Sequence, residues 1–297
     1  MDPRKRWMAL AAPVPGGWTV EVLPVGDLHT LLPRLYARAG GAPVALGVDF
    51  PLGLPREYAA RHAGAAPDFP AFLRGLAGAP DFFRVAEALD QAGPGRPFYP
   101  MRGERGMTRL SHALALGLRD AAGLSRRCDR ATPDRPAGAP LFWTLGANQV
   151  GKAALAGWRG LLLPALAGPQ PPALWPFDGL LLDLLAPGRA VVAECYPAET
   201  MRQLSLPTNG SKRRQADRLA LTPALRDRLA ALDARPDPVL DGLLAAGMGA
   251  DAAGEDRLDC LLGLLGLLQV LTGRRADTVP DDPCIRRWEG WVLGQSC

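Results

Sequence analysis

The segment from Val44 to Pro55 limits the possible folds of this chain more than any other. Five apolar or small residues lead into Asp49, and turn-forming residues follow at Pro51, Gly53 and Pro55. A short apolar run that ends in this way is typical of a strand buried on both faces of a sheet. Ligands of open α/β sheets bind outside the carboxyl ends of the strands. Asp49 is therefore either a functional carboxylate or the cap of the next turn, where Asp is also common.

A second segment, residues 189–197, has the same pattern. Three apolar residues, 191–193, lead into Glu194, and Pro197 ends the run. Two buried strands that each end in a carboxylate followed by proline are more than turn capping alone would produce. The pair therefore favours a functional role for Asp49 and Glu194.

Two more carboxylates open the most apolar stretch of the chain, residues 254–273, which has the pattern of a helix. Asp256 and Asp259 are three residues apart and so lie on one helix face. Asp256 has an alternative role as a cap, because carboxylates are favoured near a helix N-terminus. Asp259 lies deeper in the apolar stretch, where a buried charge is costly unless it is paired or binds metal.

If these elements converge, the carboxylates repel one another, and a hard divalent cation relieves the repulsion. Carboxylate oxygens suit Mg²⁺ or Mn²⁺, so we interpret Asp49, Glu194 and Asp259 as metal ligands and catalytic residues, with Asp256 assisting. Such a site activates water and stabilises phosphoryl displacement, commonly with two metals. The alternative is that each carboxylate has an independent structural role.

Three basic residues are candidates for contacting a phosphate. Lys212 and Arg214 lie at the expected start of a helix, where backbone amides also bind anions. A charged, exposed helix face is the alternative for both. Lys152 follows Gly151 on another expected helix, and a solvated side chain is the favoured interpretation there. No P-loop is present, because the upstream glycine spacing is missing.

The rest of the chain predicts one mixed α/β domain over residues 1–297, with an insertion of helices and loops at about 56–140. Residues 7–14 and 18–23 read as two strands joined by a tight turn, followed by a helix over 27–39. Helices are expected over 56–90 and 109–122, and an exposed arginine-rich loop over 125–140. Further helices are expected from Asn148, over 197–204 and over 211–246.

The composition fits a globular protein with a large core, because 48% of its 297 residues are hydrophobic and the net charge is only +4. Five scattered cysteines form no zinc motif or disulfide framework and fit a reducing compartment. No signal peptide or membrane span is expected. These features predict a cytoplasmic protein without a membrane partner, and they leave the oligomeric state open.

Taken together, these motifs resemble a domain-of-unknown-function family of predicted nucleases with a ribonuclease H-like fold. The resemblance spans most of the chain and implies a mixed sheet of about five strands flanked by helices, with acidic residues at strand ends. The matching segments are Gly16–Trp18, Gly47–Pro55, Ala193–Ala198, Lys212–Arg218, Asp256–Asp259 and Glu289–Gly294.

The chain departs from the family pattern at Ala12, where the first strand normally carries an Asp that bridges the metals. Asp178 or a loop carboxylate would have to compensate, or one metal would have to suffice. Two functions follow. One is a metal-dependent nuclease or phosphodiesterase that acts on nucleic acid or nucleotides. The other is a catalytically impaired binding module that keeps the fold. A phosphotransferase of the related actin-like fold would need a glycine-rich phosphate loop, and none is visible.

Overall fold

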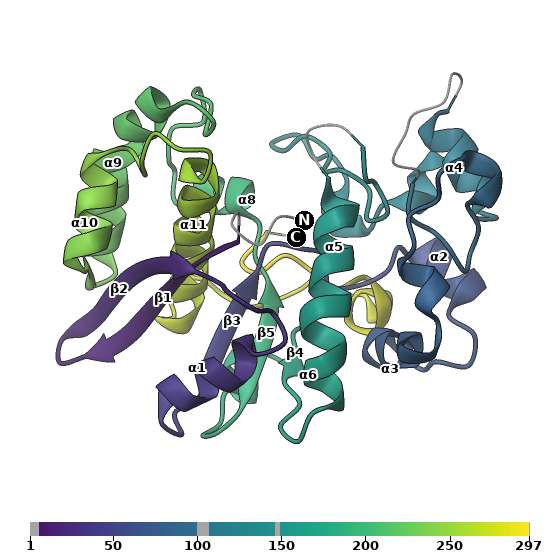
Figure 1. Ribbon diagram of the computed structural model, residues 1–297, viewed down its shortest axis with the longest axis horizontal. Helices are drawn as coiled ribbons and strands as arrows, with labels where there is room; N and C mark the ends of the chain where they lie inside the picture. The colour runs from purple at the N-terminus through teal and green to yellow at the C-terminus, as the bar shows by residue number, and fades with distance from the viewer. Residues whose placement is uncertain (1–5, 100–106, 146–148, 297) are drawn as a thin grey trace.

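The computed structural model describes residues 6–99, 107–145 and 149–296. It shows a mixed α/β protein in which two small sheets are flanked by helices. In Figure 1 the strands β3, β5 and β4 lie between two groups of elements. The β1–β2 hairpin with α9, α10 and α11 forms one group, and α2, α3 and α4 form the other.

The first sheet has the order β1 (Trp7–Val14), β2 (Gly17–Pro24) and β6 (Ala234–Pro236). The antiparallel β1–β2 hairpin confirms the predicted pair of strands. Strand β6 pairs parallel to β2 and lies within a region predicted to be only helical. That prediction was wrong at β6 because three residues are too few to show the alternation of a strand.

The second sheet has the order β3 (Val44–Val48), β5 (Ala190–Glu194) and β4 (Ala173–Leu174), with all strands parallel. Every residue of β5 is buried, as its apolar run predicted. In β3 only Val48 is buried and the other four residues are half-buried, so the predicted burial of this strand on both faces was wrong. The single sheet of about five strands that the resemblance implies is therefore replaced, in the described residues, by two three-stranded sheets.

Helix α11 connects the two sheets, because it packs against both β1 and β3. Its predicted range is confirmed almost to the residue. The helices are α1 (Leu31–Ala39), α2 (Arg56–His62), α3 (Phe69–Gly75), α4 (Arg109–Ala115), α5 (Val150–Gly157), α6 (Leu163–Ala167), α7 (Leu181–Leu184), α8 (Pro197–Gln203), α9 (Gln215–Ala231), α10 (Pro238–Ala245) and α11 (Gly254–Leu271).

Several predicted helices are shorter than expected. The helix predicted over 109–122 ends with α4 at Ala115, because Gly117 adopts a left-handed φ of 70° that closes the helix. The stretch 56–90 contains α2, α3 and three short 3₁₀ turns instead of continuous helix. Helix α5 begins at Val150, and Asn148, where the prediction began it, lies outside the described residues.

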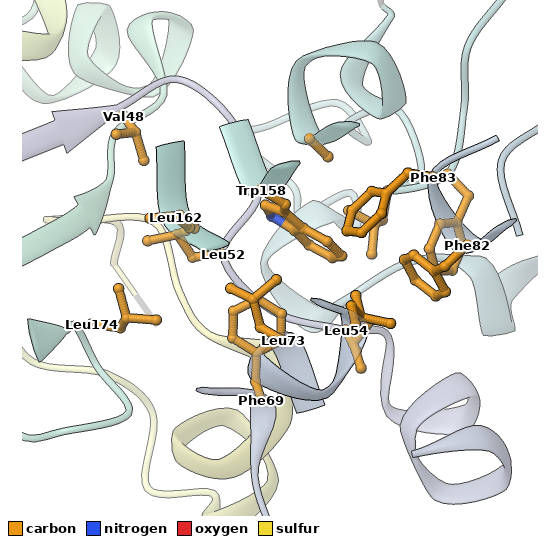
Figure 2. Close-up of a cluster of buried hydrophobic side chains, with 14 of the residues drawn as sticks. Val48, Leu52, Leu54, Phe69, Leu73, Phe82, Phe83, Trp158, Leu162 and Leu174 are labelled. Carbon is orange, nitrogen blue, oxygen red and sulfur yellow. The ribbon is translucent and has the colours of Figure 1, made fainter. Parts of the chain in front are cut away.

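The segment that follows Asp49 runs through the largest hydrophobic core. Figure 2 shows Leu52 and Leu54 among side chains from the inserted helices and from the π-helical turn Trp158–Leu162. The Trp158 indole N–H donates to the Pro51 carbonyl oxygen over 2.8 Å. The inserted residues thus share one core with β3 and β5, and this core fixes the backbone on which Asp49 stands.

Candidate functional site

Strands β3 and β5 bring the two predicted carboxylates to the same sheet edge. Val48 is in register with Glu194, and the Cys195 N–H donates to the Val48 carbonyl oxygen over 2.9 Å. Asp49 is the residue directly after Val48. The parallel pairing therefore makes Asp49 and Glu194 neighbours, although 145 positions separate them in sequence.

The Asp49 carboxylate has an unusual electrostatic environment. Desolvation by the surrounding protein is the main cause that raises its pKa from 3.8 to about 7. Repulsion from Asp259, Glu194 and Asp256 adds to the rise, and Lys212 opposes it. Within the described ranges, no hydrogen bond or ion pair engages Asp49, and the residue is exposed to solvent. The four predicted carboxylates therefore share one electrostatic neighbourhood.

The first turns of α11 supply Asp256 and Asp259. Lys212, in the loop before α9, forms an ion pair with Asp259, and each side chain is about a quarter exposed. Burial raises the pKa of Asp259, and Lys212 acts against that rise. Lys212 was predicted to contact a phosphate, and the structure places its ammonium group among the carboxylates.

Glu194 is buried, at 6% exposure, and both of its oxygens are engaged. The Arg126 guanidinium donates to them in a bidentate pair, with distances of 2.6 and 2.7 Å. The Leu52 N–H donates to the same carboxylate over 2.8 Å. Burial still raises the pKa of Glu194 although Arg126 favours its ionised form. In this arrangement Glu194 has little capacity left to hold a metal.

Arg126 is a site residue that the sequence interpretation missed. Residues 125–140 were predicted to form an exposed loop, but Arg126 is only 1% exposed. It also pairs with Asp129 over 3.0 Å and donates to the Leu52 carbonyl oxygen. Arginine is usually exposed, which misled the prediction. The available signal was Glu194 itself, because a buried carboxylate requires a partner.

The other predicted basic residues lie apart from this neighbourhood. Arg214 pairs with Asp217, one turn along α9, over 2.7 Å. Lys152 lies on α5, and no interaction connects it with the acidic residues in the part of the chain that the structure describes. Arg218 is buried and donates to the Lys212 carbonyl oxygen over 2.7 Å, so it positions the backbone that carries Lys212.

Asp178 does not take the place of the carboxylate that is missing at Ala12. Ala12 lies within β1 opposite Thr19 and offers no carboxylate. Asp178 accepts a hydrogen bond from the Leu174 N–H over 2.7 Å and so closes the turn after β4. The missing first-strand charge is therefore not replaced by Asp178 in this arrangement.

Tyr196 is a second residue at the site that was not predicted. It precedes α8, and 40% of its surface is exposed. Its pKa is raised, first by burial of the hydroxyl end and then by the nearby Asp49 carboxylate. Lys212 and Arg202 also influence this hydroxyl. An accessible aromatic ring therefore lies beside the carboxylates and Lys212.

The donor set fits a divalent cation only in part. Across the described ranges, no group of three or more His, Cys, Asp or Glu side chains is arranged to hold a metal ion. The Asp49 oxygens have no partner among the described residues and lie among like charges, which favours a cation. Asp259 becomes available only if Lys212 releases it. A site built on Asp49 and one α11 carboxylate suits one cation better than two.

Comparisons with known proteins add no assignment. No protein-family model, curated protein or solved structure matches this chain. None of the helices in residues 6–99, 107–145 and 149–296 has the length and apolarity needed to cross a bilayer. The site geometry is therefore the basis for inferring a function.

Proposed function

We propose that this protein is a phosphodiester hydrolase of ribonuclease H-like fold that acts on nucleic acid or nucleotides with one Mg²⁺ or Mn²⁺ ion. The observation that carries the proposal is the Asp49 carboxylate. It is unpartnered within the described residues, and desolvation and three like charges raise its pKa to about 7. Perturbed carboxylates of this kind are concentrated at functional sites.

The chain's own residues have separate roles in this proposal. Asp49 and Asp259 would hold the cation, with Asp256 near them on the same face of α11. Lys212 moves from Asp259 to a substrate phosphate, which offers it an equivalent negative partner. Arg126 keeps Glu194 fixed at the end of β5. When bound, the cation supplies Lewis acidity and an activated water molecule.

The proposed test is cleavage of a panel of DNA, RNA and hybrid substrates in the presence of Mg²⁺ or Mn²⁺. Asp49→Asn should lower the rate by at least about a hundredfold, because it removes the principal ligand. Asp227→Asn, on the exposed side of α9, is the matched control and should cleave normally. Metal affinity should also increase as pH rises through about 7, because Asp49 must lose its proton to bind. Cleavage that persists in EDTA or in Asp49→Asn contradicts the proposal.

A second candidate function is nucleic-acid binding without cleavage. The Arg126–Glu194 and Lys212–Asp259 pairs favour it, because they already balance two of the four carboxylates. Ala12 in place of the family's Asp also favours binding without cleavage. Tight binding that neither EDTA nor Asp49→Asn changes, together with no cleavage, would support this function over hydrolysis.

A further inference from the structure

A second charged feature lies on α2 and the segment 119–130, apart from the four carboxylates. These elements surround an open hollow of about 540 Å³, which is within the size range of small-ligand sites. Four arginines line it, with two carboxylates, Glu57 and Asp120, so the formal charge of the lining residues is +2 before their partners outside the hollow are counted. The arginines are Arg56, Arg61, Arg119 and Arg130.

Two carboxylates outside the lining, Asp282 and Glu289, pair with Arg56, but the other three arginines are only partly balanced. Glu57 is shared between Arg61 and Arg119, so one carboxylate serves two guanidinium groups. Asp120 accepts hydrogen bonds from the Ala122 and Gly123 N–H groups and caps a 3₁₀ turn. Arg130 is exposed, and no ion pair within the described residues engages its guanidinium. The hollow therefore retains positive charge that a phosphate can balance.

The ion pairs in the hollow are weak enough to open for a ligand. The Arg119 side chain is 79% exposed and that of Arg61 is 43% exposed. Pairs this exposed contribute only about 0–1 kcal/mol. A phosphate accepts bidentate hydrogen bonds from arginine and can join these pairs at little cost.

One short segment connects the hollow with the acidic site. Ser125 and Arg130 line the hollow, while Arg126, between them, reaches inward to Glu194. A ligand bound in the hollow thus lies against the same segment that holds the end of β5.

We propose that this hollow binds phosphates of a nucleic acid strand that continues from there to the acidic site. The choice of nucleic acid as ligand rests on the proposed function, because a phosphodiester hydrolase needs a surface that holds its substrate next to the reacting bond. The position of the proposed phosphate contacts follows from the positive lining, the exposed arginines and the segment shared with the acidic site. Phosphate contacts of this kind fix the register of a strand without reading its sequence.

The test is the affinity for a fluorescent single-stranded oligonucleotide, measured by anisotropy in EDTA over a range of salt concentrations. The double variant Arg119→Gln/Arg130→Gln should weaken binding at least about tenfold. The slope of the logarithm of the binding constant against the logarithm of the salt concentration should also fall in magnitude by about 1.4, since each phosphate contact on a single strand contributes about 0.7. The matched control is Arg74→Gln/Arg84→Gln. It also removes one exposed arginine that pairs with a carboxylate and one that has no ion pair within the described residues.

A second pair of variants changes affinity in the opposite direction. Glu57→Gln removes the competing carboxylate from the hollow and should tighten binding. Asp81→Asn, which removes the equivalent partner of Arg84, should leave the affinity unchanged. This result does not depend on whether the arginine variants fold fully.

The outcomes separate this inference from the proposed function. Equal losses in the two arginine double variants would show a general charge effect and overturn the inference. Displacement of the oligonucleotide by millimolar inorganic phosphate alone would also overturn it, because the hollow would then be a small-anion site. If wild type does not cleave but the hollow variants lose affinity, the inference holds and the hydrolase proposal fails. If wild type cleaves and the hollow variants bind normally, the hydrolase proposal holds and this inference fails.

Discussion

At the scale of single residues, the pair between Arg126 and Glu194 decides how much charge the site can carry. Both side chains are almost fully buried, and their bidentate hydrogen bonds join the 125–130 segment to the end of β5. Burying two charges is costly, so the net contribution of such a pair to stability is small. Removing only one member is expensive, because the other charge then remains buried and unpaired. The pair therefore has a structural role, because it fixes the 125–130 segment to the end of β5. Asp49 remains the carboxylate that is available to bind a ligand.

The first prediction concerns the ion pair between Arg126 and Glu194. Arg126→Met should lower the free energy of unfolding by about 3–5 kcal/mol, because Glu194 loses its counter-charge. The double variant Arg126→Met/Glu194→Gln should recover a clear part of that loss, since Gln still accepts from the Leu52 N–H. Urea denaturation at pH 7 measures both. A double variant no more stable than the single one would show that packing of Arg126, and not its charge, is what matters.

At the scale of elements, α4 is held by both a cap and a buried histidine. Thr108 and Ser111 form reciprocal hydrogen bonds that close the first turn of the helix. His112 is buried and its Nε2 donates to the Pro97 carbonyl oxygen over 2.8 Å, so the neutral ring carries its proton on Nε2. Burial lowers the pKa of His112 from 6.5 to about 4. The helix therefore depends on keeping this imidazole neutral.

The second prediction is a loss of stability in mild acid. Between pH 6.5 and 4 the unfolded chain binds a proton at His112 that the folded chain does not, so stability falls as pH falls through this window. The contribution is about 3 kcal/mol by pH 4, given 1.36 kcal/mol per pKa unit. His112→Gln keeps a donor toward Pro97 and should remove this part of the pH dependence. Thermal unfolding from pH 7 to 4 compares the two proteins, and identical pH profiles would contradict the assignment.

The elements that the sequence predicted well are those whose hydrophobic pattern lies within the element itself. The hairpin β1–β2, strand β5 and helix α11 each have a pronounced hydrophobic pattern and a clear end. Strand β6 and the short turns of the insertion depend instead on what the rest of the chain packs against them. The same distinction applies to the site. Asp49 and Glu194 were placed by a pattern at strand ends, whereas Arg126 acquires its role only because a distant carboxylate is buried beside it.

At the scale of the whole molecule, the C-terminal segment crosses the chain directly after Asp49. Gly53 and Gly290 make this crossing possible, with left-handed φ values of 133° and 65°. A Cβ on Gly53 would lie 2.1 Å from the Glu289 carbonyl oxygen, and one on Gly290 would lie 2.0 Å from that of Leu52. The Leu54 N–H donates to the Trp288 carbonyl oxygen over 2.7 Å at the same place. Residues near the end of the chain thus hold the segment that supports the candidate site.

The last prediction compares this crossing with a left-handed glycine whose Cβ position is open. Gly53→Ala should destabilise the protein by at least about 3 kcal/mol, because the new methyl group clashes with backbone that cannot yield easily. Gly64 also has a left-handed φ, of 61°, but nothing lies within 4 Å of its Cβ position. Gly64→Ala should therefore cost only about 1 kcal/mol, the penalty of a left-handed alanine. The difference between the two variants in urea denaturation contains the clash with the C-terminal segment together with the greater strain of alanine at φ 133° than at φ 61°. Equal losses of stability would mean that the contact between the two segments contributes little to the free energy of unfolding. The position of Asp49 would then depend on β3 and α11 alone.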